Sequence, residues 1–482
     1  MCSNLKSIMA GALLTLLSSV AVAAGSERAD SMTAIADDFV RVGLLFQNHD
    51  PSPYLFFGPE ALRTEAKRQQ VALPGVVTQL VALRARIEAL PATAAPDEQR
   101  RRRDLAQRIT ATVTRGGILM GNFPAGFDEE VRLIFDVQVP RYDEAHFRAV
   151  TAKLDSIIPG EGELVARVEA FREQFVIPPE RLDAVMGRAI AECRARTRAH
   201  LALPADEQVT LSMTSGKHWV GFAEYRGNSQ STYHLNRDVP VHIERAIELG
   251  CHEAYPGHHV HATLLDQELV GRRGWNEYSL LTLLGPIAVV AEGAANFGVD
   301  LAFSRQQRID FDRTVLMPLA GLDGRQLETY YHYIDLLDEL NFARNEVARK
   351  YLYEGMPRDQ AVQWLMEFGL ETRATASQRI DFIDTQRVYV ITYNYGKRLV
   401  RDYVLAKGQP GSPEAWQAFQ EILTTPLSPA DLLAAKATPT PAAEAARVDA
   451  GPTQGYDSAG GWTRQAEPSD DARAASTGFQ GR

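Results

Sequence analysis

Residues 251–261 read Cys251-His252-Glu253-Ala254-Tyr255-Pro256-Gly257-His258-His259-Val260-His261 and contain four of the eleven histidines of the chain. When a helix carries the pattern His-Glu-x-x-His, its two histidines lie one turn apart and can bind zinc, and the glutamate can act as a general base. The stretch begins with His252-Glu253, but the fifth position is Pro256, so the strict pattern is interrupted.

Two interpretations of this interruption are open. Removing Pro256 and Gly257 leaves His-Glu-Ala-Tyr-His, so the pair can be an insertion into a zinc-binding helix. Proline lacks a backbone donor and clashes with the preceding turn, and glycine allows the distortion. This interpretation makes His258 the second histidine ligand. On an unbroken helix, at about 100° per residue, His259 would lie within about 20° of His252, and His258 about 240° away. That alternative makes His259 the ligand.

The string His-Glu-x-x-Pro-Gly-His-His resembles the signature of domain-of-unknown-function family 885. These are bacterial proteins, often exported, that are similar to gluzincin metallopeptidases. The resemblance covers about residues 35 to 435 and includes the segments Asn48–Pro51, Phe57–Glu60, Tyr225–Asn228 with Asn236, and Tyr393–Gly396. In the family the first histidine after Pro-Gly is the more regular one, which implies that His258 is the ligand.

A carboxylate in an apolar segment is the candidate for a third ligand. Glu292 lies in the mostly apolar segment 276–303, where a carboxylate is costly unless it is paired or bound to a cation. Gluzincins take their third zinc ligand from a glutamate on a later helix. The string that begins at Glu292 resembles the family's Glu-Gly-Trp motif, although Ala294 replaces the tryptophan. The alternative for Glu292 is a buried salt bridge with an arginine.

These residues together predict a catalytic zinc site with the ligands His252, His258 and Glu292 and with Glu253 as the general base. Zn²⁺ is therefore the expected cofactor. The resemblance implies one further catalytic residue, because Tyr393 matches the tyrosine of the family's Tyr-x-x-Gly motif. Peptidases of this kind often use a tyrosine to donate to the oxyanion. The alternative for Tyr393 is core packing.

Three more residues are expected to support the ligands or to bind substrate. Asn296 follows Glu292 at i+4 and could orient a ligand. Arg398 belongs to a polar cluster late in the chain and could hold a substrate carboxylate. His259, when it is not the ligand, is expected to lie next to the site.

The N-terminus has the form of a secretory signal peptide over residues 1–23. Lys6 precedes the apolar run Ile8–Val22, and Ala21-Val22-Ala23 is a cleavage pattern. The run is shorter than the ~20 residues that a membrane span needs, so we expect no stable membrane insertion after cleavage. The expected location is periplasmic or secreted.

Removal of the signal peptide leaves two cysteines, Cys193 and Cys251. Two buried thiols are the favoured interpretation, and one disulfide is the alternative in an oxidising compartment. The sequence does not decide between these two states.

Residues 24–437 mostly show helical spacing of apolar residues, and this length allows two lobes around a cleft. Residues 209–236 are rich in Ser, Thr, Gly and aromatic residues and predict a small β element next to the metal-binding helix. We therefore predict a mainly α, metallopeptidase-like fold.

Residues 438–482 have the composition of a disordered tail. Helices are predicted at 144–157, 163–175, 179–200 and 358–368, and over a last stretch from 371 to 403.

Two groups of charged residues are expected to face solvent. Glu244 and Glu248 are spaced i, i+4 before the histidine stretch, and Arg100–Arg103 lie between two acidic residues. The region 61–90 is predicted to form one long helix or two shorter ones, with Pro74 as the joint.

The net charge of −10 argues against a nucleic acid partner. The leading hypothesis is an exported zinc peptidase that cleaves short peptides by means of a zinc-activated water. One alternative is a zinc hydrolase of another amide or ester. A second alternative, from a different class, is a metal- or peptide-binding protein without turnover. The expected partner is a small peptide or amide substrate.

Overall fold

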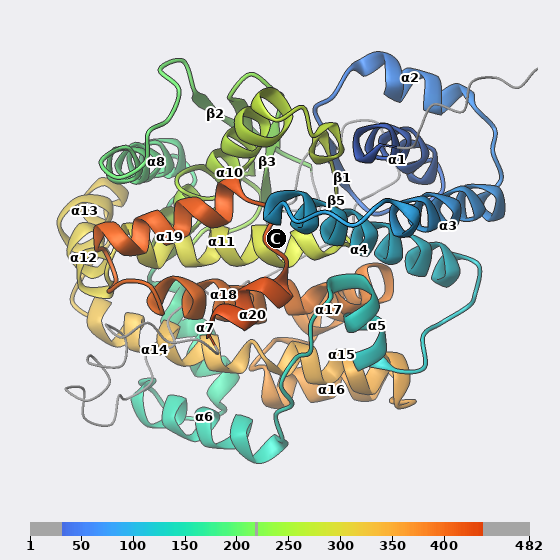
Figure 1. The fold of residues 1–482 in the computed structure, drawn as a ribbon. Coiled ribbons are helices and arrows are strands. Elements are labelled where there is room, and N and C mark those ends of the chain that lie inside the picture. Colours follow the sequence, from blue (N-terminus) through green and yellow to red (C-terminus); the bar gives the residue numbers. More distant parts are fainter. Residues whose placement is uncertain (1–30, 217–219, 437–482) are drawn as a thin grey trace, which may run out of the picture.

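The computed structural model describes residues 31–216 and 220–436. The expected signal peptide, residues 1–23, and the expected tail, residues 438–482, lie outside these ranges. Within them the chain is mainly helical with two small sheets (Figure 1), so the prediction of a mainly α fold is confirmed.

The first four helices make a core of their own. They are α1 (Met32–Gln47), α2 (Glu60–Arg68), α3 (Leu73–Ala89) and α4 (Pro96–Leu119). Apolar side chains at helical spacing, such as Ile35 and Phe39 of α1 and Leu80 of α3, meet in one buried cluster. Pro74 lies in the first turn of α3, where a missing N–H costs no helical hydrogen bond, so the predicted division there is confirmed.

The following helices contribute to a second and larger core. They are α5 (Phe127–Phe135), α6 (Glu144–Ile157), α7 (Leu164–Glu173) and α8 (Leu182–Arg198). α6 has the predicted bounds, and Asp143 begins it by accepting a hydrogen bond from the backbone N of His146.

Two sheets interrupt the helices. β1 (Tyr54–Phe56) pairs antiparallel with β5 (Leu280–Thr282). The three-stranded sheet has the order β2 (Gln208–Thr214), β4 (Gln230–Asn236), β3 (Gly221–Tyr225), with β2 parallel and β3 antiparallel to β4. This sheet is the predicted β element, and β3 is an edge strand. Phe222 pairs with His234 and Ala223 with Tyr233 in the β3–β4 register.

The central elements carry the histidine stretch and Glu292. They are α9 (Ile243–Leu249), the π-helical turn η1 (Gly250–Ala254), α10 (His258–Leu265), the π-helical segment η2 (Asp266–Arg272), the 3₁₀ turn η3 (Asn276–Ser279) and α11 (Pro286–Ala302). In Figure 1, α11 runs through the middle of the molecule, with α18 and α19 on either side.

The remaining elements complete the larger core. They are α12 (Arg305–Phe311), η4 (Asp312–Leu316), α13 (Met317–Ala320), α14 (Leu327–Leu340), α15 (Ala343–Tyr353), α16 (Arg358–Phe368), α17 (Arg373–Gln386), η5 (Arg387–Val390), α18 (Ile391–Leu405), α19 (Pro413–Thr424) and α20 (Pro429–Lys436). The last predicted helical stretch is broken at Arg387, whose φ of 49° is left-handed.

The expectation of solvent-facing charge is wrong for Glu244 and Glu248, and in the run Arg100–Arg103 it fails at Arg101, whereas Arg103 is exposed. Glu244 and Glu248 are each only 6% exposed, because α14 covers this face and Tyr330 donates to Glu244 Oε2 at 2.8 Å. Arg101 is also buried and donates from Nε and Nη2 to the Glu277 carboxylate at 2.6 and 2.9 Å. A charged pattern predicts a solvent face only when no other element packs over it.

Among the described residues, no single helix is long and apolar enough to cross a membrane. The helix Pro286–Ala302 and the segment Arg305–Ala320 meet the length and composition requirement only as a pair bent by 72°.

Candidate metal centre

The candidate ligands come from three short segments. His252 lies on η1, His258 is the first residue of α10, and Glu292 lies on α11. Between η1 and α10 the helix is interrupted at Tyr255-Pro256-Gly257, where the N–H of Gly257 donates to Cys251 O at 3.0 Å. A Cβ atom on Gly257 would lie 1.8 Å from His252 O, so only glycine fits this approach. The helix is therefore interrupted at Pro256-Gly257 and begins again at His258.

The three side chains converge inside the protein. His252 Nε2 lies 3.5 Å from Glu292 Oε2, and His258 Nε2 lies 3.7 Å from Glu292 Oε1. One ligand atom from each residue lies within 4.8 Å of the other two, and all three residues are buried. Two atoms each about 2.1 Å from a zinc ion, at a tetrahedral angle, would lie about 3.4 Å apart. The spacing and the donor types therefore fit a zinc ion.

Burial dominates the electrostatics of this group. It lowers the pKa of His252 to about 3 and the pKa of His258 well below its usual value, so both imidazoles are neutral, which is the form that binds metals. Burial, together with the charge of Glu292, raises the pKa of Glu253 well above its usual value. A divalent cation would offset the repulsion between these two carboxylates.

Glu253 has one anchored oxygen atom. The N–H of Ala223, in the edge strand β3, donates to Glu253 Oε2 at 3.0 Å. Glu253 Oε1 is buried and accepts no hydrogen bond from the described residues. The predicted β element thus holds the candidate base while its second oxygen remains available.

Two residues form hydrogen bonds with two of the candidate ligands, His252 and Glu292. Asn296 Oδ1 lies 3.1 Å from His252 Nδ1, and the Tyr389 hydroxyl donates to Glu292 Oε1 at 2.8 Å. Asn296 was expected at this place from its i+4 spacing, but the sequence analysis missed Tyr389. Tyr389 lies four residues before Tyr393, and this one-turn spacing was the signal that could have found it. The two rings are 5.4 Å apart, edge to face.

The close crossing of α11 and α18 brings Tyr389 next to Glu292 and Tyr393 next to Tyr389. A Cβ atom on Gly293 would lie 2.3 Å from Gly396 O, and one on Gly396 would lie 2.6 Å from Val289 O. Gly396 is the glycine of the Tyr-x-x-Gly string. The two glycines therefore allow the backbones of the helices to touch beside Glu292.

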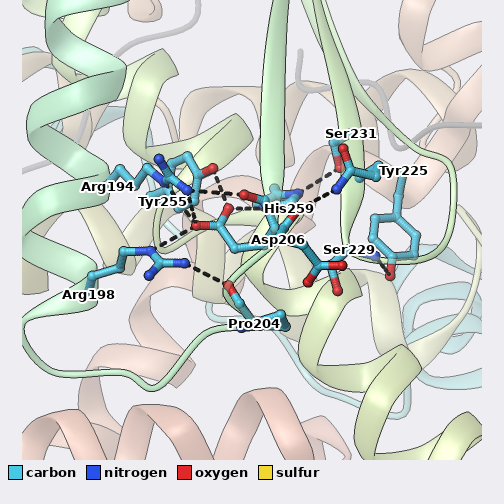
Figure 2. A network of polar contacts seen from close by, with 11 residues as sticks. Arg194, Arg198, Pro204, Asp206, Tyr225, Ser229, Ser231, Tyr255 and His259 are labelled. Atoms are coloured by element: carbon cyan, nitrogen blue, oxygen red, sulfur yellow. Dashed lines mark hydrogen bonds and ion pairs between the residues drawn. The ribbon is translucent and has the colours of Figure 1, made fainter.

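Two of the predicted supporting residues, His259 and Arg398, form their hydrogen bonds with residues other than the three candidate ligands. His259 has its Nε2 3.1 Å from Glu207 Oε2 and its Nδ1 2.8 Å from Ser231 Oγ, so its side chain lies outside the three-residue group (Figure 2). Arg398 donates to the Tyr142 hydroxyl at 2.6 Å and lies over the ring of Phe342. Its substrate-binding role stays a prediction.

The two cysteines form a disulfide, although buried thiols were the favoured interpretation. Cys193 of α8 and Cys251 of η1 have Cα atoms 5.4 Å apart. The bond joins α8 to the residue directly before His252. Sequence reasoning could not choose this state because the two residues are 58 positions apart.

No family model matches this chain, and no curated protein sequence matches it. Solved structures similar to it include a candidate lipoprotein from Colwellia psychrerythraea, 15% identical with a TM-score of 0.48, covering 85% of this chain and 76% of that one. An M32 carboxypeptidase from Deinococcus radiodurans R1 is 15% identical with a TM-score of 0.46, covering 86% and 97%. Metallocarboxypeptidase 1 of Trypanosoma cruzi is 13% identical with a TM-score of 0.45, covering 87% and 97%. At these TM-scores the function has to be argued from the site itself.

Proposed function

We propose that this protein is a zinc-dependent hydrolase that cleaves peptide bonds in short peptides. The observation that carries the proposal is the approach of His252, His258 and Glu292 to within 4.8 Å, with Glu253 adjacent to the first of them. These three residues would hold the zinc ion, and two imidazoles with one carboxylate are a ligand set of catalytic zinc sites.

Zinc, when bound, supplies a Lewis acid and lowers the pKa of a water molecule. Glu253 is the proposed general base, which takes the proton of the attacking water on Oε1 and passes it to the leaving amine. The hydrogen bond from the N–H of Ala223 to Oε2 supports this role. Asn296 and Tyr389 fix the orientation of two ligands. Tyr393 is the proposed donor to the developing oxyanion.

The location proposed for this activity is outside the cytoplasm. The pattern of a signal peptide in residues 1–23 supports it, and so does the disulfide between Cys193 and Cys251, because disulfides persist mainly in oxidising compartments.

Metal analysis combined with a peptide-library digest tests the proposal. The purified protein should contain about one zinc per chain and should cleave peptides, and the cleavage should stop after chelation and return with zinc. Zinc without peptide cleavage would favour hydrolysis of another amide or ester. Binding of metal without turnover of any such substrate would contradict an enzymatic role.

A further inference from the structure

A buried carboxylate outside the metal group collects four donors from two parts of the chain. Glu207, which directly precedes β2, is 2% exposed. Its Oε1 accepts from Arg194 Nε and Arg198 Nε of α8, both at 2.9 Å. Its Oε2 accepts from the Tyr255 hydroxyl at 2.5 Å and lies 3.1 Å from His259 Nε2. Figure 2 shows these donors converging from α8 and from the histidine stretch.

One oxygen atom thereby joins the two sides of the Pro-Gly interruption. Tyr255 directly precedes Pro256-Gly257, and His259 follows it. The distance between these two side chains sets how sharply the chain turns back after η1. His258 lies between them, and the turn decides where its Nε2 atom points. Glu207 Oε2 thus fixes a geometry on which the approach of His258 to Glu292 depends.

The contacts of His259 also fix its tautomer. The carboxylate of Glu207 requires a proton on Nε2, which leaves Nδ1 to accept from the Ser231 hydroxyl at 2.8 Å. A serine, histidine and glutamate in line could also activate a nucleophile. Here, however, the cavity beside Ser231 and His259 measures about 20 Å³, which is room for about one water molecule. Both side chains are also buried, and we therefore interpret this chain of hydrogen bonds as a support.

We propose that Glu207 is a positioning residue for the metal centre, which holds the Tyr255–His259 turn closed so that His258, and not His259, faces Glu292. This inference rests on the zinc ligands named in the proposed function. Glu207 holds this turn as a charged carboxylate. Burial would raise its pKa, but the hydrogen bonds from His259, Tyr255, Arg194 and Arg198 outweigh that effect and lower the pKa to about 2. The same helix, α8, also holds the other side of His252 through Cys193.

The test compares Glu207→Gln with a matched control, Glu277→Gln. Glu277 is fully buried and accepts two hydrogen bonds from Arg101, but it does not contact the histidine stretch. Outer partners of metal ligands typically contribute 10–100-fold to affinity. Glu207 contacts residues on either side of His258 and not a ligand itself, so we expect Glu207→Gln to weaken zinc binding, measured by chelator competition, by about 10-fold, the lower end of this range. The Co²⁺-loaded variant should also show an altered visible spectrum, whereas Glu277→Gln should match the wild type in both measurements.

A second measurement needs no metal. In the metal-free protein, Glu207→Gln should speed amide hydrogen exchange in residues 255–261, and Glu277→Gln should not. Tyr255→Phe, which removes one hydrogen bond and keeps the carboxylate, should give a smaller change of the same sign if Glu207→Gln does not fold. Unchanged exchange and unchanged zinc affinity in folded Glu207→Gln or Tyr255→Phe would overturn the inference. Failure of the wild type to bind zinc would instead overturn the proposed function, and the exchange measurement would still decide whether Glu207 holds the turn.

Discussion

Glu253 combines an anchored oxygen atom with a buried one that accepts no hydrogen bond from the described residues. Glu253→Gln keeps the shape and the hydrogen bond from Ala223 but cannot take a proton. We expect this variant to retain about one zinc per chain and to lose roughly 10²–10⁴-fold in turnover rate. Metal analysis and peptide hydrolysis on the same sample measure both quantities. Turnover close to that of the wild type would remove Glu253 from the mechanism.

His258 and His259 are adjacent, yet their side chains have different partners. His258→Ala should remove a zinc ligand and leave the purified protein without stoichiometric zinc. His259→Ala should retain zinc with an affinity lowered by about 10-fold, because it acts only through the turn. Each variant is the control for the other in an equilibrium zinc titration. The reverse order of affinities would show that the unbroken-helix interpretation describes the metal-bound protein.

Tyr389 donates to Glu292, whereas Tyr393 is the proposed oxyanion donor. Tyr389→Phe should therefore lower zinc affinity by about 10-fold or more. Tyr393→Phe should mainly lower kcat and leave zinc affinity close to that of the wild type. Zinc titration and steady-state kinetics of the two variants separate these effects. Equal effects of both variants on zinc affinity would contradict this division of roles.

The sequence singled out the residues whose chemistry is unusual for their surroundings, although the family resemblance, and not spacing, favoured His258 over His259. His252 and His258 stand out by the Pro-Gly interruption, and Glu292 stands out as a carboxylate in an apolar segment. Glu207 was missed because a glutamate is ordinary in its own segment, and Tyr389 was missed although it lies one turn before Tyr393. Their roles arise only when distant segments meet. Their contacts are not determined by local sequence.

The crossing of α11 and α18 is the element-scale feature that supports the site. Gly396→Ala would place a Cβ atom 2.6 Å from Val289 O, so the helices would have to separate. We expect a loss of about 1–3 kcal/mol in the free energy of unfolding, and weaker zinc binding because Tyr389 would move from Glu292. Urea denaturation and zinc titration measure the two effects.

Gly187 of α8 is a matched control, because an added Cβ atom meets no atom within 4 Å there. Gly187→Ala should be neutral or should stabilise the protein by up to about 1 kcal/mol. If Gly396→Ala behaved in the same way, close helix contact would not be what the Tyr-x-x-Gly string provides.

Two helices with a clear apolar period were predicted to the residue, and the small sheet was predicted as an element but without its strand pairing. α6 and α16 have the predicted bounds, because apolar spacing defines both helices, Asp143 caps the start of α6, and Gly369 follows the end of α16. The strand β2 pairs in parallel with β4, and such pairing joins segments that the sequence separates. The break at Arg387 had no local signal, because no proline or glycine lies there.

At the scale of the whole molecule, the disulfide closes a loop of 58 residues between α8 and the metal-binding turn. The chain-entropy model gives such a loop about 4 kcal/mol of stabilisation. The double variant Cys193→Ala/Cys251→Ala should therefore unfold at a lower urea concentration than the oxidised wild type. Reductant should destabilise the wild type and leave the double variant unchanged. An equal midpoint for the oxidised wild type and the double variant would show that the bond does not stabilise the fold.

The disulfide also ties the metal-binding turn to the redox state of its surroundings. Cys251 directly precedes His252, and its side chain is bonded to Cys193 of α8, whereas the metal group consists of His252, His258 and Glu292. The bond therefore restrains the backbone from which the first histidine ligand projects. Protein made under reducing conditions would lack this restraint, and His252 would be held less firmly.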